Sequence, residues 1–95
     1  MRYVIRDDEI LYLEAEILSP VAQLHWKPKR WSHNWVKYYR EVLDKACETL
    51  KDFGVEVVYE FIHPENTKNI KTMRLFGFDE VQTDEVVIFT RSIDE

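Results

Sequence analysis

Cysteine, glycine and proline are scarce in this chain of 95 residues, with one, two and three copies, and long apolar runs are absent. The single Cys47 cannot form an internal disulfide or supply a cysteine-based metal cluster. Uncharged apolar runs such as Val86 to Phe89 fall far below the roughly 18 residues that a membrane-spanning helix needs. No signal-peptide core is visible at the N-terminus. Together these absences predict a soluble, cytoplasmic protein without a metal centre or a membrane partner.

The overall composition is that of an ordinary folded domain. Hydrophobic residues make up 45% and charged residues 33% of the chain, which excludes the disordered and low-complexity classes. A chain of this length buries only about two-thirds of its unfolded surface, so there is room for one modest core. We therefore expect a single domain over residues 1 to 95.

Charge is distributed unevenly along the chain. The net charge is −5, yet no acidic residue lies between Glu16 and Glu41, where several cations and all three tryptophans occur. The cations are Lys27, Lys29, Arg30, Lys37 and Arg40, and the tryptophans are Trp26, Trp31 and Trp35. A positive region in an acidic protein attracts anions, so we expect an anionic ligand there. The alternative is a solvated basic face whose aromatic rings point into the core.

Alternation of apolar and polar residues predicts antiparallel strands in the N-terminal part of the chain. The predicted strands are Arg2 to Arg6, Ile10 to Leu18 and Val21 to Trp26. One face of the second strand carries Leu11, Leu13, Ala15 and Ile17, and one face of the third carries Ala22, Leu24 and Trp26. Prolines at positions 20 and 28 interrupt the pattern where strands end.

A helical period replaces the alternation from Trp35 onward. Apolar residues then recur at three- and four-residue steps, which predicts an amphipathic helix from Trp35 to Phe53. The residues expected to face the sheet are Val42, Leu43, Ala46, Leu50 and Phe53. Ser32 or Asn34 is placed to cap the first turn, and Gly54 supplies the left-handed residue after the last turn.

The C-terminal part predicts a strand, a short helix and two more strands. The first strand is Val55 to Ile62, with Val55, Val57, Tyr59 and Phe61 on one face. The short helix opens at Pro64-Glu65-Asn66 and closes at Gly77, and the last strands are Phe78 to Gln82 and Val86 to Arg91. The order βββαβαββ predicts an α+β (mixed α/β) fold with a twisted, mostly antiparallel sheet and two helices.

That order and two segments resemble the GNAT family of N-acetyltransferases. Asn66 followed by Gly77-Phe78 has the family's spacing, and Ala22 to Pro28 is similar to its fourth strand. The resemblance covers nearly the whole chain. It implies that the third and fourth predicted strands form a diverging parallel pair that holds acetyl-CoA, joined by a right-handed helical crossover.

The resemblance also implies a phosphate-binding loop. The family holds the CoA pyrophosphate on backbone N–H groups of a Q/R-x-x-G-x-G/A loop at a helix N-terminus. The corresponding run here is Arg30 to Trp35, with Ser32 and Asn34 where glycines are expected, and Lys29 and Arg30 add positive charge. The implied cofactor-binding residues are Trp26, Lys29, Arg30, Trp31, Ser32, His33, Asn34, Trp35 and Asn66.

The catalytic acid that many family members use has no counterpart. They place a tyrosine on the last helix to protonate the departing thiolate, and the alignment puts Met73 there, which has no proton to donate. The candidates for acid or base are His25, Tyr59 and His63, followed by His33 and Glu60. Each of these residues also fits a structural or surface role.

The start of the family fold is a further point at which we expect the chain to depart from the family. The resemblance implies that the family's first strand and two following helices lack counterparts in residues 1 to 95, and we therefore expect no readable pocket for the amine acceptor. Small GNAT-like proteins of tailed phages are similarly reduced. Apolar surface left by the missing elements could be covered in a homodimer.

Two other functions compete with an acyl-CoA-binding N-acetyltransferase. In the first, Trp26, Trp31 and Trp35 form a surface for a protein partner, and the fold has no catalytic role. In the second, the same basic and aromatic residues bind single-stranded nucleic acid. The net charge of −5 argues against nucleic acid.

Overall fold

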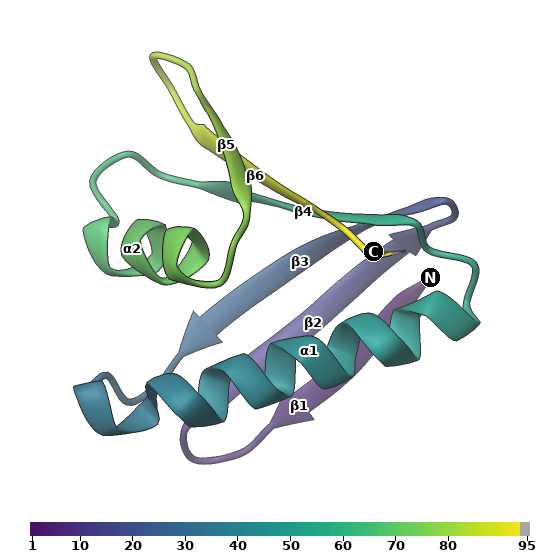
Figure 1. The fold of residues 1–95 in the computed structure, drawn as a ribbon, viewed down its shortest axis with the longest axis horizontal. Coiled ribbons are helices and arrows are strands. Elements are labelled where there is room, and N and C mark those ends of the chain that lie inside the picture. The colour runs from purple at the N-terminus through teal and green to yellow at the C-terminus, as the bar shows by residue number, and fades with distance from the viewer. Residues whose placement is uncertain (94–95) are drawn as a thin grey trace.

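A six-stranded sheet forms the centre of the computed structural model, which describes residues 1–93 (Figure 1). The strands within these residues lie in the order β1-β2-β3-β4-β6-β5, and every neighbouring pair except β3 and β4 is antiparallel. They are β1 (Arg2–Asp7), β2 (Leu11–Leu18), β3 (Val21–Pro28), β4 (Val57–Ile62), β5 (Asp79–Gln82) and β6 (Val87–Ser92). The helical elements are the 3₁₀ turn η1 (His33–Trp35), α1 (Val36–Asp52) and α2 (Thr67–Leu75). The predicted fold class and element order are confirmed.

Helix α1 covers the first three strands (Figure 1). Alternate side chains of β2 and β3 are buried, as the sequence pattern predicts. The buried residues of α1 are Tyr39, Val42, Leu43, Ala46, Cys47 and Leu50. Phe53 is neither in the helix nor buried, because α1 ends at Asp52 and Phe53 is 42% exposed. Its ring still meets the sheet at its edge, where it packs against Tyr3 of β1 with the ring centroids 5.5 Å apart.

Polar side chains and a glycine set the ends of the helices. Ser32 Oγ accepts a hydrogen bond from Asn34 N–H at 3.1 Å, so Ser32 caps the η1 turn that precedes α1. Gly54 follows α1 with a φ of +80°, a conformation that glycine adopts without strain. Asn66 Oδ1 accepts a hydrogen bond from Asn69 N–H at 3.3 Å and caps α2. No helix in residues 1–93 is long and apolar enough to cross a membrane.

Strand β4 turns a different face to the core than its residue types suggest. It begins at Val57, and its buried residues are Val58, Glu60 and Ile62. On the opposite side Phe61 is 52% exposed. The face that looks more apolar in the sequence therefore points away from the core, and an acidic residue points into it.

Trp26 of β3 connects the two halves of the core. Its indole ring lies 5.3 Å from the Tyr39 ring of α1 and 6.4 Å from the Phe76 ring at the end of α2, measured between centroids. Both contacts are edge-to-face, an arrangement that aromatic pairs favour. The large ring stands between the two helices at the end of the sheet where β3 leaves β4.

Candidate functional site

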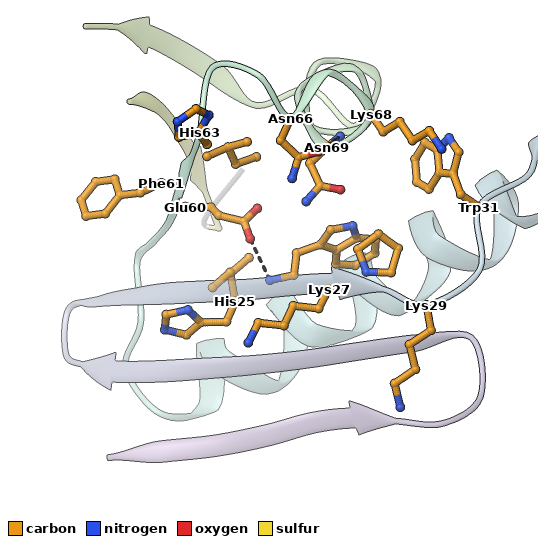
Figure 2. A pocket seen from close by; sticks show the side chains of 14 residues that line it. His25, Lys27, Lys29, Trp31, Glu60, Phe61, His63, Asn66, Lys68 and Asn69 are labelled. Atoms are coloured by element: carbon orange, nitrogen blue, oxygen red, sulfur yellow. Dashed lines mark hydrogen bonds between the residues drawn. The ribbon is translucent and has the colours of Figure 1, made fainter. Parts of the chain in front are cut away.

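Strands β3 and β4 pair at one end only. Their backbone pairing joins residues 21–23 to residues 57–59 and then stops, although both strands continue. The strands therefore diverge toward their C-terminal ends, as predicted. Glu60 is the first residue of β4 beyond the paired region, and its side chain reaches across the gap (Figure 2). Trp26 N–H donates a hydrogen bond to Glu60 Oε1 at 2.7 Å.

The gap opens into a cavity of about 610 Å³, a volume typical of small-molecule sites. Its lining consists of residues 24–29, Trp31, residues 60–63, Asn66, Lys68 and Asn69. In Figure 2, Asn66 and Asn69 point from the start of α2 toward β3, and Trp31 lies near Lys68. Two strands and the start of one helix thus enclose the cavity.

Glu60 is a buried carboxyl group at the narrow end of this cavity. The residue is 4% exposed, and within residues 1–93 it has no ion-pair partner. Burial raises the pKa of Glu60 from 4.5 to about 8, and the hydrogen bond from Trp26 N–H opposes the rise by a smaller amount. The group is therefore mostly protonated at neutral pH. Glu60 Oε2 and Trp26 Nε1 are buried without a hydrogen-bond partner in the described part of the chain.

The remaining charged groups of the cavity lining are cationic. Lys29 lines the cavity, but its Nζ donates hydrogen bonds to Asp7 Oδ1 at 2.8 Å and to Asp8 O at 2.7 Å. Figure 2 accordingly shows Lys29 pointing away from Glu60. Lys68 lies across the cavity near Trp31 in the same view. An anion at the wide end therefore meets Lys68 more directly than Lys29.

The predicted phosphate-binding loop is anchored by aromatic contacts. The Trp31 ring stacks on the Tyr39 ring with centroids 5.7 Å apart, and the Tyr39 hydroxyl donates a hydrogen bond to Arg30 O. Trp31 is 37% exposed, whereas Trp26 is 3% exposed and Trp35 is half-buried. The alternative in which the three tryptophans share one exposed surface is therefore not favoured.

Some N–H groups of this loop already have partners. Asn34 N–H donates to Ser32 Oγ at 3.1 Å, and Trp35 N–H donates to Ser32 O at 3.0 Å. The N–H groups of Trp31, Ser32 and His33 have no hydrogen-bond partner among the residues that the structure describes. The N–H groups that the loop can offer to an anion are therefore those of residues 31–33, immediately before Asn34 and Trp35.

No protein-family model and no curated protein matches the sequence. Solved structures match its fold. PaiA N-acetyltransferase from Thermoplasma acidophilum, in complex with coenzyme A, has a TM-score of 0.73 and 21% identity over 87% of this chain and 53% of its own. PseH N-acetyltransferase from Campylobacter jejuni, in complex with acetyl coenzyme A, has a TM-score of 0.70 and 15% identity over 87% and 59%. The chain has the GNAT fold.

The ribosomal-protein-S18-alanine N-acetyltransferase from Escherichia coli agrees, with a TM-score of 0.69 and 16% identity over 90% of this chain and 63% of its own. The chain thus spans between 53% and 63% of the length of these structures. At these identities the likeness is one of fold. In the GNAT fold, β3 and β4 take the places of the family's fourth and fifth strands.

Two of the three predicted catalytic residues reach the cavity. His25 of β3 and His63, just after β4, are both part of its lining. Tyr59 is not, because it alternates with Glu60 along β4 and so faces the other side of the sheet. Its ring instead meets Phe61 at 5.4 Å between centroids.

The predicted cofactor-binding residues divide between the cavity and the loop. Those lining the cavity are Trp26, Lys29, Trp31 and Asn66, and those outside it are Arg30, Ser32, His33, Asn34 and Trp35. Sequence reasoning missed Lys68 and Asn69. The spacing of Asn69 three residues after Asn66 was the available signal, because residues three apart share a helix face. No group of three or more His, Cys, Asp or Glu side chains is placed to hold a metal ion in residues 1–93.

Proposed function

We propose that the chain binds an acyl-CoA in the gap between β3 and β4. The observation that carries the proposal is the cavity of about 610 Å³ at the point where this parallel strand pair diverges. Two solved structures of the same fold are complexes with coenzyme A or acetyl coenzyme A, which supports the choice of ligand. The pantetheine arm runs along the gap, and the acyl group lies toward Glu60.

The loop before α1 supplies the phosphate contacts in this proposal. Unpaired N–H groups of Trp31, Ser32 and His33 meet the pyrophosphate oxygens, next to the positive end of α1. Arg30 in the loop and Lys68 across the cavity provide positive charge. Of the two residues that stand where the family has glycines, Ser32 has an unpaired backbone N–H, whereas the N–H of Asn34 already donates to Ser32 Oγ.

The reaction that fits the fold is transfer of the acyl group to an amine acceptor of unknown identity. His25 and His63 line the cavity and can exchange protons with the reacting groups. Met73 is fully buried, so the position of the family's tyrosine offers neither a proton nor access to the cavity. Losing such an acid typically costs about 10²- to 10⁴-fold in rate, and we therefore expect slow turnover.

Calorimetric titration with acetyl-CoA tests the binding proposal. The double variant Arg30→Ala with Lys68→Ala should bind several-fold more weakly and with a flatter salt dependence, because each cation contributes about 0.3–1 kcal/mol. Lys29→Ala should have a smaller effect, since that side chain is held by Asp7. Lys45→Ala on the exposed face of α1 is the matched control and should bind as the parent does. An absence of heat at millimolar acetyl-CoA contradicts the proposal.

A further inference from the structure

Two buried polar atoms beside the cavity lack partners. Glu60 Oε2 and Trp26 Nε1 have no hydrogen-bond partner within residues 1–93, and both residues line the cavity. A buried polar group without a partner is costly, and such groups are rare in folded proteins. Where two residues that line one cavity carry such atoms, a ligand that supplies the missing partners is the simplest reason for keeping them.

The hydrogen bond of Glu60 determines what kind of partner its second oxygen needs. Oε1 accepts the Trp26 N–H at 2.7 Å, so Oε1 acts as the carbonyl oxygen of the carboxyl group. The residue is 4% exposed and has no ion-pair partner in the described residues, and burial raises its pKa to about 8. The proton therefore resides on Oε2, which makes Oε2 a donor that needs an acceptor.

The position of Glu60 identifies that acceptor within the proposed ligand. Backbone pairing of β3 and β4 ends at residues 23 and 59, so Glu60 stands at the narrow end of the gap. A ligand whose phosphates lie near Trp31 at the wide end has its acyl group at this narrow end. The group nearest Glu60 is then a thioester, whose carbonyl oxygen is a hydrogen-bond acceptor.

We propose that the protonated carboxyl group of Glu60 donates a hydrogen bond from Oε2 to the carbonyl oxygen of the acyl group. Trp26 N–H, held on Oε1, orients the carboxyl group for this contact (Figure 2). In this proposal Glu60 contacts the ligand directly and recognises the carbonyl oxygen of the thioester. The inference rests on the proposed function, because it needs the acyl arm to lie between β3 and β4.

Binding that depends on the Oε2 proton weakens when the proton is lost. An ionised Oε2 has no hydrogen to donate and repels the carbonyl oxygen, so raising the pH through about 8 removes the contact. The other titratable groups around the cavity are His25 and Lys27 of β3, Lys29 just after β3, His63 after β4 and Lys68 of α2, with Tyr39 of α1 packed against the Trp26 ring. Changes in the charge of these groups should affect the affinities of two ligands equally when the ligands differ only at the carbonyl group.

The test compares acetyl-CoA with S-ethyl-CoA, a thioether in which a methylene replaces the carbonyl group. The parent protein should bind acetyl-CoA roughly three- to tenfold more tightly at pH 6.5, the range for one net hydrogen bond. The ratio should fall to about one at pH 9, where Glu60 is ionised. Circular dichroism at both pH values verifies that the protein is folded.

Two variants separate the hydrogen bond from the shape of the side chain. Glu60→Gln keeps an oxygen for Trp26 N–H and an N–H donor for the carbonyl, so its ligand ratio should persist at both pH values. Glu60→Met fills a similar volume without a donor, and its ratio should be about one throughout.

The outcomes distinguish this inference from the proposed function. Equal affinities of the parent for both ligands at pH 6.5, or an unchanged ratio in Glu60→Met, would overturn the role of Glu60 while acyl-CoA binding stands. A ratio in the parent that does not change with pH also overturns it. If neither ligand binds the parent protein, the proposed function and the inference both fail.

Discussion

The line along which β3 and β4 run side by side, here called the β3–β4 seam, has a closed end and an open end. The two ends are held together by different contacts. At the closed end, residues 21–23 and 57–59 are joined by backbone pairing. The β2–β3 turn reinforces this end, since Glu56 N–H donates to Pro20 O at 2.6 Å and Ser19 Oγ donates to Gly54 O at 2.9 Å. At the open end, one hydrogen bond from Trp26 N–H to Glu60 crosses the gap.

The difference shows how two neighbouring strands of one sheet can be kept apart at one end while the rest of the sheet stays paired. Trp26 places a large ring between α1 and α2 at the open end, in contact with Tyr39 and Phe76. The side chain of Glu60 then occupies the backbone donor that a neighbouring strand would otherwise satisfy. The closed end gives the seam its stability, and the open end keeps polar groups facing a cavity.

The largest expected effect concerns the core beside the closed end. Leu50 is fully buried, and its carbonyl oxygen accepts hydrogen bonds from Phe53 N–H and Val55 N–H in the turn that leads to β4. Leu50→Ala should lower the free energy of unfolding by about 2–5 kcal/mol through the lost contacts and the cavity left behind. Lys45→Ala, on the exposed side of the same helix, should be nearly neutral. Equal midpoints of the two variants in urea denaturation would contradict the helix orientation.

The second effect belongs to the open end and appears as a pH dependence of stability. The pKa of Glu60 is raised by burial from 4.5 to about 8, so the folded state holds a proton that the unfolded state releases in between. This contribution to stability is complete below the unfolded pKa and is lost as the pH rises through the folded pKa. The linkage predicts a loss of about 3 kcal/mol between pH 5 and pH 8, measured by urea denaturation.

Glu60→Gln is the control for this pH dependence, because glutamine can accept the Trp26 N–H but does not ionise. Its stability should change much less with pH over the same range. The pKa values of Glu14 and Glu80 are lowered mainly by hydrogen bonds from Tyr12 and Arg74, against a smaller effect of burial. For Asp8 burial is the largest single effect and raises the pKa, but hydrogen bonds from Tyr38 and from the backbone N–H groups of residues 10 and 11, with the charge of Arg6, together lower it. All three groups therefore titrate below this window. A parent and a variant with parallel profiles would show that Glu60 is ionised in the folded protein.

The smallest effect compares Gly54, which lies between α1 and the closed end, with Gly77, which follows α2. Gly54 and Gly77 both have a φ of +80°, so alanine at either position should cost about 1–2 kcal/mol of backbone strain. A methyl group at Gly54 also lies 3.0 Å from Ser19 Oγ, whereas one at Gly77 meets nothing within 4 Å. We therefore expect Gly54→Ala to have the lower thermal midpoint, and the reverse order would contradict the tight contact at the closed end.

The sequence predicts the fold well because its strongest patterns are local. The alternation in β2 and the helical period of α1 correctly predict most of the buried residues of these two elements. The parallel pairing of β3 and β4 follows from the strand, helix, strand order together with the family resemblance. The helical period continues one residue beyond Asp52, where the helix ends, so it predicts a buried Phe53 where the structure has a partly exposed one.

The site is less visible in the sequence because it depends on where two strands part. Acidic residues on a strand normally face water, so the alternation around Glu60 gives no sign that this carboxyl group is buried. The sequence therefore also places Tyr59, the adjacent residue, in the site, although Tyr59 lies on the other face of the strand. Lys68 enters the cavity through the position of α2, which no local pattern specifies.

The most direct test of the account is a titration with acetyl-CoA followed by proton–nitrogen correlation spectra. The account predicts that the backbone and indole N–H signals of Trp26 and the backbone N–H signals of Trp31 and His33 move together, because they border the ligand. The N–H signals of Ala22 and Val58, which pair across the closed end, should stay in place. No shifts at millimolar ligand, or shifts confined to the closed end, would contradict an acyl-CoA site at the open end of the seam.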